Sequence, residues 1–297
     1  MENDCDTHPP IDGWLASFMA REQLPEAALA GIREHFTALA SWLEQRCMRK
    51  PAFVLGINGA QGTGKSTLAR FLRETLERRE LNVALLSLDD FYLPRAVRQQ
   101  LARDVHPLLA TRGAPGTHDS AALQECLEKL RAASADTVTA WPVFDKAMDD
   151  RAGQHQAFAG APRAILLEGW CVGTPPEDDE MLVAPLNALE AAADADAVWR
   201  RYVNRQLQTN YAALFRQLDA LCFLRVPDFG LIRQWRGVQE TKLRASSGRG
   251  MSDSELDEFI LHFERVTRIA LRELPARADC VLDFDANHRC VSSSFRP

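Results

Sequence analysis

Several features that identify common protein classes are missing from this chain of 297 residues. No apolar stretch approaches the roughly 20 residues that a membrane-spanning helix needs. The formal net charge is −6, whereas surfaces that bind nucleic acid are usually basic. The N-terminus is acidic and lacks the basic region that opens a secretory signal. We therefore expect neither a nucleic-acid partner nor a membrane, and any anionic ligand must be met by local cationic side chains.

Disulfide and metal frameworks are missing as well. The seven cysteines contain no C-x-x-C pair and are odd in number, and the histidines show no metal-ligand spacing. Cysteines with this distribution are typical of small buried hydrophobic positions in a reducing compartment. The sequence therefore predicts a cytoplasmic protein.

What the chain does contain is a complete phosphate-binding loop, Gly59-Ala60-Gln61-Gly62-Thr63-Gly64-Lys65-Ser66. Its glycines allow backbone N–H groups to close around phosphate oxygens. Lys65 can then reach the β- and γ-phosphates, and the Ser66 hydroxyl can bind Mg²⁺. The apolar residues 52–57 predict a buried strand before the loop, and apolar residues at helical spacing predict a helix after it. The motif in this setting predicts binding of a nucleoside triphosphate.

The order of apolar segments predicts an α/β fold of the P-loop NTPase type, with three α/β/α layers and a mainly parallel five-stranded sheet. Short β-rich runs alternate with long, mostly helical segments, which is the pattern of crossover units. Residues 1–50 are expected to form a helical extension packed on the core, and residues 51–297 a P-loop domain with lid insertions. The five predicted strands span residues 53–57, 83–88, 164–167, 220–226 and 280–284.

Acidic side chains follow two of these strands, and in open α/β sheets ligands bind beyond the carboxyl ends of the strands. Asp89 and Asp90 end the second strand. Because neighbouring side chains of a strand point in opposite directions, these two can serve different tasks. One can take a proton from a substrate hydroxyl, while the other holds Mg²⁺-bound water or braces the loop. Glu168 ends the third strand, where we expect it to help Ser66 hold magnesium.

Two further stretches carry polar groups that can meet a substrate. Arg112 and His118 lie in a loop rich in proline and glycine, and they can grip an anionic or hydroxylated substrate. Asp119 either joins them or caps the helix that starts near Ala121. Residues 142–151 mix both charges beside a proline, so they form either part of the substrate site or a solvated loop.

The segment between the fourth and fifth strands is rich in basic residues. In a phosphoryl-transfer enzyme, a basic lid stabilises the charge on the transferring group and excludes water. A helix with a solvated basic face has the same pattern. We expect Arg233 or Arg236 to act from a lid. The basic residues are Arg233, Arg236, Lys242, Arg244 and Arg249.

Together these motifs resemble the D-glycerate 3-kinase family, one of the P-loop kinases related to phosphoribulokinase, uridine kinase and bacterial pantothenate kinase. The resemblance covers residues 53–263 and departs from the family pattern at residues 259–267 and in the short linker 146–150. It is carried by the phosphate loop, Ser87-Leu-Asp-Asp-Phe-Tyr92, Arg112-Gly113 with His118-Asp119, Asp145-Lys146 with Asp150-Arg151, Glu168-Gly-Trp170, Trp235-Arg236-x-x-Gln239-Glu240 and Gly250-Met-Ser-Asp253.

The resemblance implies that residues 51–297 form a kinase domain, and it assigns roles to single residues. Thr67 joins Lys65 and Ser66 in binding phosphates and Mg²⁺. Asp89 is the first candidate for the base and Asp90 the second. Arg236 is a candidate catalytic arginine, while the choice between it and Arg233 stays open. The residues expected to line the acceptor site are Arg112, His118, Asp119, Asp145, Lys146 and Arg151.

The predicted activity is transfer of the γ-phosphoryl group of ATP, with Mg²⁺, to a hydroxyl of a small hydroxy acid, and D-glycerate is the first candidate acceptor. Two alternatives stay open. The same machinery can serve another acceptor, such as a nucleoside or pantothenate. The chain can also be an ATP-binding regulatory or assembly module whose acceptor site does not work. The sequence leaves the oligomeric state open.

Overall fold

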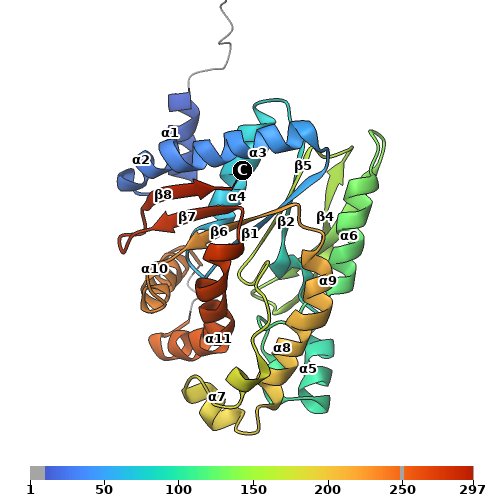
Figure 1. The fold of residues 1–297 in the computed structure, drawn as a ribbon, viewed down its shortest axis with the longest axis vertical. Coiled ribbons are helices and arrows are strands. Elements are labelled where there is room, and N and C mark those ends of the chain that lie inside the picture. The colour runs from blue at the N-terminus through green and yellow to red at the C-terminus, as the bar shows by residue number, and fades with distance from the viewer. Residues whose placement is uncertain (1–10, 248–250, 297) are drawn as a thin grey trace, which may run out of the picture.

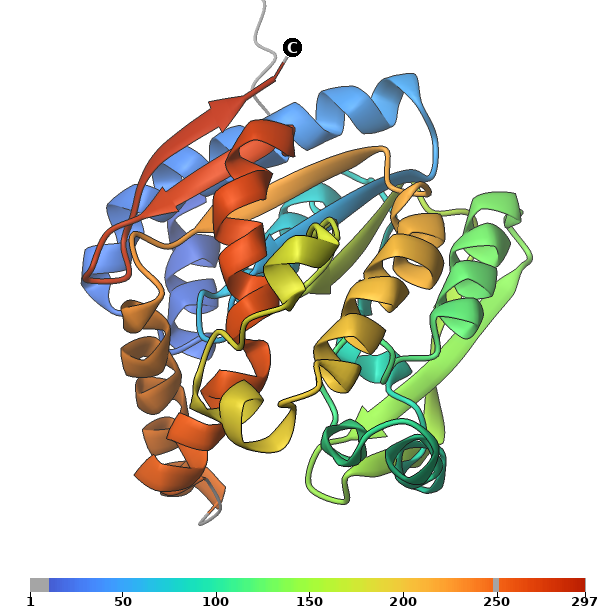
Figure 2. The ribbon, with the colours of Figure 1, turned by 60° about the horizontal axis from the view of Figure 1, so that its bottom comes forward.

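The computed structural model describes residues 11–247 and 251–296, in which a central sheet lies between two layers of helices (Figure 1, Figure 2). Six strands of this described part form the sheet, in the order β2-β5-β1-β6-β7-β8. Strands β2, β5, β1, β6 and β7 pair in parallel, and β8 pairs antiparallel with β7. The predicted three-layer fold with a mainly parallel sheet is confirmed. The strands are β1 (Phe53–Gly59), β2 (Val83–Ser87), β5 (Ala164–Gly169), β6 (Ala220–Arg225), β7 (Cys280–Phe284) and β8 (Cys290–Phe295).

Three strands were not predicted. The edge strand β8 contains three consecutive serines, so it lacks the apolar alternation that marks a strand in a sequence. Strands β3 (Val138–Asp145) and β4 (Asp150–Ala159) form a separate antiparallel hairpin. Its register shifts between Pro142 and Phe144, since proline cannot donate a hydrogen bond to the ladder. The charged stretch 142–151 is therefore the end of a hairpin and not an unstructured loop.

The two faces of the sheet are covered by different helices, as Figure 2 shows. Leu55 and Ile57 of β1 pack with α1, α3, α4 and α10, whereas Val54 faces the layer of α6, α9 and α11. None of the described helices is long and apolar enough to cross a membrane. The helices are α1 (Ile11–Arg21), α2 (Leu29–Gly31), α3 (Thr37–Arg49), α4 (Lys65–Glu77), α5 (Arg95–Asp104), α6 (Ser120–Ala132), α7 (Ala188–Ala193), α8 (Val198–Gln206), α9 (Ala212–Phe215), α10 (Gly230–Ser247) and α11 (Asp253–Arg277).

The N-terminal helical segment packs directly on α4. The rings of Phe18 and Phe36 each meet Phe71 edge to face, with 5.5 Å between centroids. Trp14 adds a hydrogen bond from its indole nitrogen to Glu74 at 3.2 Å. The segment thus shares one hydrophobic core with the sheet. The division into an extension over 1–50 and a domain over 51–297 stays a prediction.

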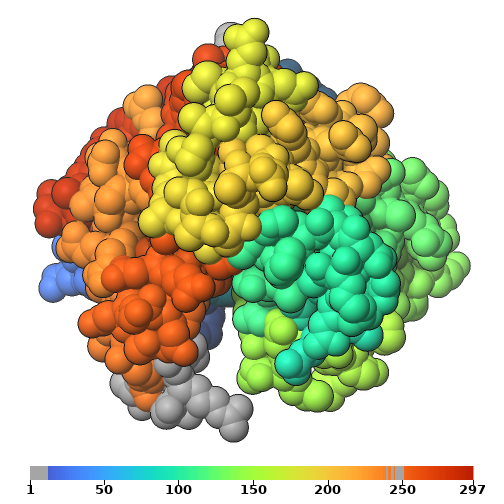
Figure 3. All heavy atoms as spheres, turned by 90° about the horizontal axis from the view of Figure 1, so that it is seen from below, coloured from blue at the N-terminus to red at the C-terminus, as the bar shows by residue number. Residues whose placement is uncertain are grey.

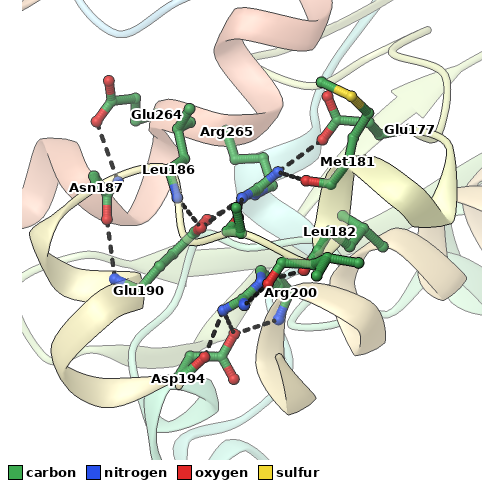
Figure 4. A network of polar contacts seen from close by, with 12 residues as sticks. Glu177, Met181, Leu182, Leu186, Asn187, Glu190, Asp194, Arg200, Glu264 and Arg265 are labelled. Atoms are coloured by element: carbon green, nitrogen blue, oxygen red, sulfur yellow. Dashed lines mark hydrogen bonds and ion pairs between the residues drawn. The ribbon is translucent and has the colours of Figure 1, made fainter. Parts of the chain in front are cut away.

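A buried network of ion pairs fixes the segment between β5 and β6 on α11 (Figure 4). The guanidinium of Arg265 contacts Glu177 at 2.9 Å and Glu190 at 2.6 Å, and the Glu190 side chain is 1 % exposed. A second pair, Arg200 with Asp194 at 3.1 Å, is fully buried. Each charge is buried together with its partner, so none can be removed without leaving the other uncompensated.

We expect Arg265→Met to lower the free energy of unfolding by about 3 kcal/mol, because it leaves the buried carboxylate of Glu190 without its cation and leaves Glu177 only its longer contact with Arg272 at 3.3 Å. Urea unfolding followed by tryptophan fluorescence measures this loss. The matched control is Arg233→Met, which removes the same group from an exposed pair with Asp257 and should change stability little. Equal losses in the two variants would contradict the structural role of the network.

Candidate active site

The phosphate loop joins the carboxyl end of β1 to the first turn of α4. Gly62 and Gly64 have φ angles of +81° and +90°, in the left-handed region that glycine adopts without strain. A Cβ at Gly62 would lie 3.0 Å from the backbone of Trp235 and Arg236, so α10 lies directly against the loop. A Cβ at Gly64 would meet no atom within 4 Å. Open space therefore faces the N-terminus of α4, where helix geometry favours an anion.

The carboxylate of Glu168, at the end of β5, lies beside the phosphate loop. Its Oε1 accepts hydrogen bonds from the hydroxyls of Ser66 at 3.1 Å and Ser87 at 2.8 Å. Its Oε2 is buried and has no hydrogen-bond partner among the described residues. A buried carboxylate oxygen without a partner is costly, and a bound cation would supply one. The hydroxyl of Ser66 and the carboxylate of Glu168 are oxygen ligands of the kind that Mg²⁺ prefers, so the predicted pair fits this ion.

Asp89 lies between two lysines from different parts of the chain. It sits in the short helical turn η3 (Leu88–Phe91) after β2, and its side chain is 25 % exposed. Its Oδ2 accepts a hydrogen bond from Lys146 at 2.6 Å, and its Oδ1 accepts one from the hydroxyl of Tyr92 at 3.0 Å. Burial alone would raise its pKa, but the charges of Lys146 and Lys65 outweigh burial and hold the pKa of Asp89 well below its usual range. The carboxylate is therefore ionised at neutral pH.

Asp90 has the opposite electrostatic environment. Burial raises the pKa of Asp90 to about 6, although the backbone N–H of Phe144 donates to its Oδ1 at 3.5 Å. The negative charge of Asp89 adds to this rise. Two adjacent carboxyls are thus driven apart in pKa, which is the usual sign of different chemical tasks.

Arg236 brings positive charge near Asp89, and Arg112 lies near Arg236. Arg236, in α10, forms an ion pair with Glu240 and lies over the ring of Phe259, 5.4 Å from its centroid. Burial lowers the pKa of Arg236, while the charges of Glu240 and Asp89 raise it and that of Arg112 lowers it, so these side chains act on one another. Of the two lid arginines left open by the sequence, Arg236 is the one that the structure brings near Asp89.

The other residues of the predicted lid lie elsewhere than near Asp89 or outside what the structure describes. Arg233 pairs with Asp257 on the exposed side of α10 and α11, and Arg244 is exposed. The side chains of Gln239 and Lys242, together with residues Arg249 and Gly250, lie outside what the structure describes. Seen from below, the surface is hollowed between α10 and α11 (orange) and the green segment of α5 with the β3–β4 hairpin (Figure 3).

Three predicted acceptor residues hold the surrounding loops in place. Asp119 caps the N-terminus of α6 with one carboxylate oxygen and accepts a bond from Arg151 at 2.9 Å with the other. Arg151 also donates to the backbone oxygen of Tyr92 at 3.1 Å. Asp145 accepts bonds from the backbone N–H groups of residues 147 and 148 at 2.8 and 3.1 Å. These contacts fix the hairpin turn that carries Lys146, and any direct contact of the three with a substrate stays a prediction.

Arg112 and His118 come from the same loop but differ in charge. Arg112 pairs with Asp149 in the hairpin turn and keeps 29 % of its side chain exposed. His118 is buried, and burial lowers its pKa to about 4. Its ring is therefore neutral at neutral pH. An anion can be met by the charge of Arg112, whereas His118 offers only an uncharged hydrogen-bonding group.

Thr67 connects the phosphate loop with the N-terminal segment. Its hydroxyl donates to Glu22 at 3.1 Å, and Glu22 also binds Arg70 at 2.6 Å. Glu22 was not identified from the sequence, because no local pattern links side chains 45 positions apart. Since the hydroxyl proton of Thr67 is already donated, any phosphate contact by this residue would use its backbone N–H.

We expect Asp90→Asn to raise the free energy of unfolding at pH 7 by roughly 1–2 kcal/mol, after allowance for solvent screening. The raised pKa means that the folded protein keeps a proton that the unfolded chain has lost. Stability of the native protein should thus fall as the pH rises from about 4 to about 6, and asparagine removes this loss. Thermal unfolding at pH 4 and pH 7 checks this, with the exposed Asp136→Asn as control. A gain of the same size at both pH values would contradict it.

Comparisons with known proteins bear on what this site does. No family model matches the sequence. The chain is 36 % identical over 221 residues to the uncharacterized kinase mug58 of Schizosaccharomyces pombe, a match that covers 71 % of this chain and 78 % of the relative. It is 28 % identical over 223 residues to the chloroplastic D-glycerate 3-kinase of Arabidopsis thaliana, covering 72 % of this chain and 46 % of that protein.

Solved structures agree with the fold. D-glycerate 3-kinase from Cryptococcus neoformans superposes with a TM-score of 0.76 at 23 % identity, covering 88 % of this chain and 99 % of the other. The YGR205w protein superposes with a TM-score of 0.70, also at 23 % identity, covering 92 % and 99 %. At this identity the likeness shows the fold alone. From the sequence relatives and the phosphate loop together, this chain is a P-loop kinase and belongs to the family that includes D-glycerate 3-kinase.

Proposed function

We propose that the chain transfers the γ-phosphoryl group of ATP to a hydroxyl of a small hydroxy acid, D-glycerate being the first candidate. One observation carries the proposal. An ionised carboxylate, Asp89, lies beside the phosphate loop and is bound by a lysine from the hairpin turn. The name of the Arabidopsis relative supports glycerate as the acceptor.

The phosphate loop would bind and orient the nucleotide. Backbone N–H groups at the start of α4 would donate to phosphate oxygens, and Lys65 would neutralise charge on the β- and γ-phosphates. Ser66 and Glu168 would hold Mg²⁺, which when bound screens the negative charge of the phosphates. In phosphoryl transfer, positioning and charge neutralisation supply most of the rate.

Asp89 would accept the proton of the attacking hydroxyl as the oxygen–phosphorus bond forms. Its low pKa in the nucleotide-free protein is due in part to Lys65. Phosphates that share Lys65 would weaken this pull and raise the basicity of Asp89 when the reaction needs it. Asp90, which is partly protonated near neutral pH, remains the second candidate for the base.

The acceptor site suits a small acid better than a neutral ligand. Arg112 is partly exposed and pairs with Asp149 in the same hairpin turn that carries Lys146, and a guanidinium can bind a carboxylate through two hydrogen bonds. Arg236 would stabilise the charge on the transferring group from the side of α10. A nucleoside or pantothenate as acceptor, and a regulatory ATP-binding module, remain the alternatives. A cytoplasmic location also remains a prediction.

Release of ADP, measured with purified protein, Mg²⁺ and ATP, tests the proposal against a panel of D-glycerate, L-glycerate, uridine and pantothenate. D-glycerate should give the highest kcat/KM. Turnover with uridine or pantothenate alone would show that this compound, and not D-glycerate, is the acceptor. If no acceptor raises turnover above the basal rate while ATP still binds, the regulatory alternative holds.

Lys65→Ala should reduce kcat by about 10²-fold or more, because it removes the cation closest to the transferred phosphates. The control is Lys129→Ala, which truncates an exposed lysine paired with Glu125 on α6. Coupled measurement of ADP release compares the two variants. Unchanged phosphoryl transfer in Lys65→Ala would contradict the role of the loop.

Asp89→Asn should reduce kcat by about 10²- to 10⁴-fold, while the Kd for ATP changes by less than about 3-fold, because the lost group acts on the acceptor and not on the nucleotide. Calorimetry gives the Kd and single-turnover kinetics give the rate. Loss of ATP binding with chemistry intact would make Asp89 a magnesium residue. A larger rate loss in Asp90→Asn would move the base to Asp90.

A further inference from the structure

Tyr211 lies far from Asp89 in sequence, on the helical segment between β5 and β6. It ends the π-helical turn η6 (Leu207–Tyr211), and its side chain is fully buried. Single π-helical turns are rare and are frequently found at functional sites, because the extra residue re-aims the side chains of the turn. The proposed chemistry does not use this tyrosine.

The hydrogen bonds of Tyr211 determine where its proton points. Its oxygen accepts a bond from the backbone N–H of Gly116 at 3.1 Å and lies 2.5 Å from Nδ1 of His118. The backbone N–H can only donate, and among the described residues no acceptor other than Nδ1 of His118 lies within hydrogen-bonding distance of the tyrosine's own proton, so we assign the tyrosine as the donor to the histidine. Nδ1 of His118 is then the acceptor, and in a neutral imidazole the remaining proton must be on Nε2.

His118 in turn contacts the residue that binds Asp89. Its ring stacks on Tyr92 with 4.3 Å between centroids and 22° between planes, and the backbones of the two residues form an isolated β-bridge. The hydroxyl of Tyr92 donates to Oδ1 of Asp89 at 3.0 Å. Nε2 of His118 is buried without a hydrogen-bond partner among the described residues.

We propose that Tyr211 is a positioning residue of the kinase reaction. It holds His118 as the neutral Nε2–H tautomer, stacked on Tyr92, so that Tyr92 orients Asp89. This inference rests on the proposed function, in which Asp89 takes the proton from the acceptor. The low pKa of His118, caused by burial, agrees with a ring that stays neutral while the enzyme works.

Tyr211→Phe tests the role, because it removes one hydroxyl and keeps the buried ring. We expect kcat with D-glycerate to fall about 10-fold, equivalent to about 1.4 kcal/mol, while the Kd for ATP stays within about 2-fold. The matched control is Tyr202→Phe. Tyr202 lies on α8 of the same segment and also packs on Gly116, and its hydroxyl makes no hydrogen bond within the described part of the chain. An equal kcat in the native protein and Tyr211→Phe would overturn the proposal.

A second measurement needs no acceptor and so separates this proposal from the proposed function. Long-range ¹H–¹⁵N NMR at pH 7 reports the tautomer of each of the seven histidines, and loss of one signal set in His118→Asn assigns His118. The native protein should show a protonated Nε2 and an unprotonated Nδ1, and Tyr211→Phe should show a mixture of tautomers. A protonated Nδ1 in the native protein overturns the proposal, even if D-glycerate is phosphorylated. If His118 shows the expected tautomer but no acceptor is phosphorylated, then Tyr211 does position His118 and the proposed function is wrong.

Tyr92→Phe provides a third variant, measured beside Tyr211→Phe. It breaks the same chain of contacts one step closer to Asp89. If the two tyrosines act through one route, the double variant should lose no more activity than the more severe single variant. If the fold-losses of kcat in the two single variants instead multiply in the double variant, Tyr211 does not act on Asp89 through Tyr92, which would contradict the proposal.

Discussion

The ion pair between Asp89 and Lys146, with Lys65 nearby, is the interaction around which the rest of this site is arranged. It joins three segments that are separate in sequence: the turn after β2, the tip of the β3–β4 hairpin and the first turn of α4. A carboxylate that is partly buried stays ionised only if cations offset the cost of burial. The two lysines provide this offset, and under the proposed function they would also meet the phosphates and an acidic acceptor. The same charges therefore stabilise the free protein and prepare it for anionic ligands.

The helix α11 packs against several of the segments that surround the site. Its Phe263 meets Trp170 edge to face at 4.8 Å and packs so closely on Gly113 that a Cβ there would overlap the ring. Its Phe259 lies under Arg236. Because Arg265 of the same helix is held in a buried ion network, α11 has little freedom to slide. The helix α11 thus contacts the loop that carries Arg112, the end of β5 and Arg236.

The parts of this molecule that follow from local sequence patterns were predicted well. The phosphate loop and the apolar strands β1, β2, β5, β6 and β7 each carry their signal within a few neighbouring residues. Strand β8 could not be predicted, since its serines take part in the sheet only through pairing with β7. The contacts of Glu22 with Thr67 and of Tyr211 with His118 could not be predicted either, because each joins residues far apart in the chain. For Asp119, the sequence alone left cap and ligand equally open, and the structure shows that it does cap α6.

The proposed chemistry depends most directly on the ionisation of Asp89, which carboxyl-selective ¹³C NMR can follow in the nucleotide-free protein. The Asp89 resonance, assigned with Asp89→Asn, should show an ionised carboxylate at every pH from 4 upward, and its pKa should rise in Lys146→Met as the nearest cation is removed. A resonance that titrates at the ordinary aspartate value in both proteins would contradict the account, because Asp89 would then not be held by the lysines that define the site.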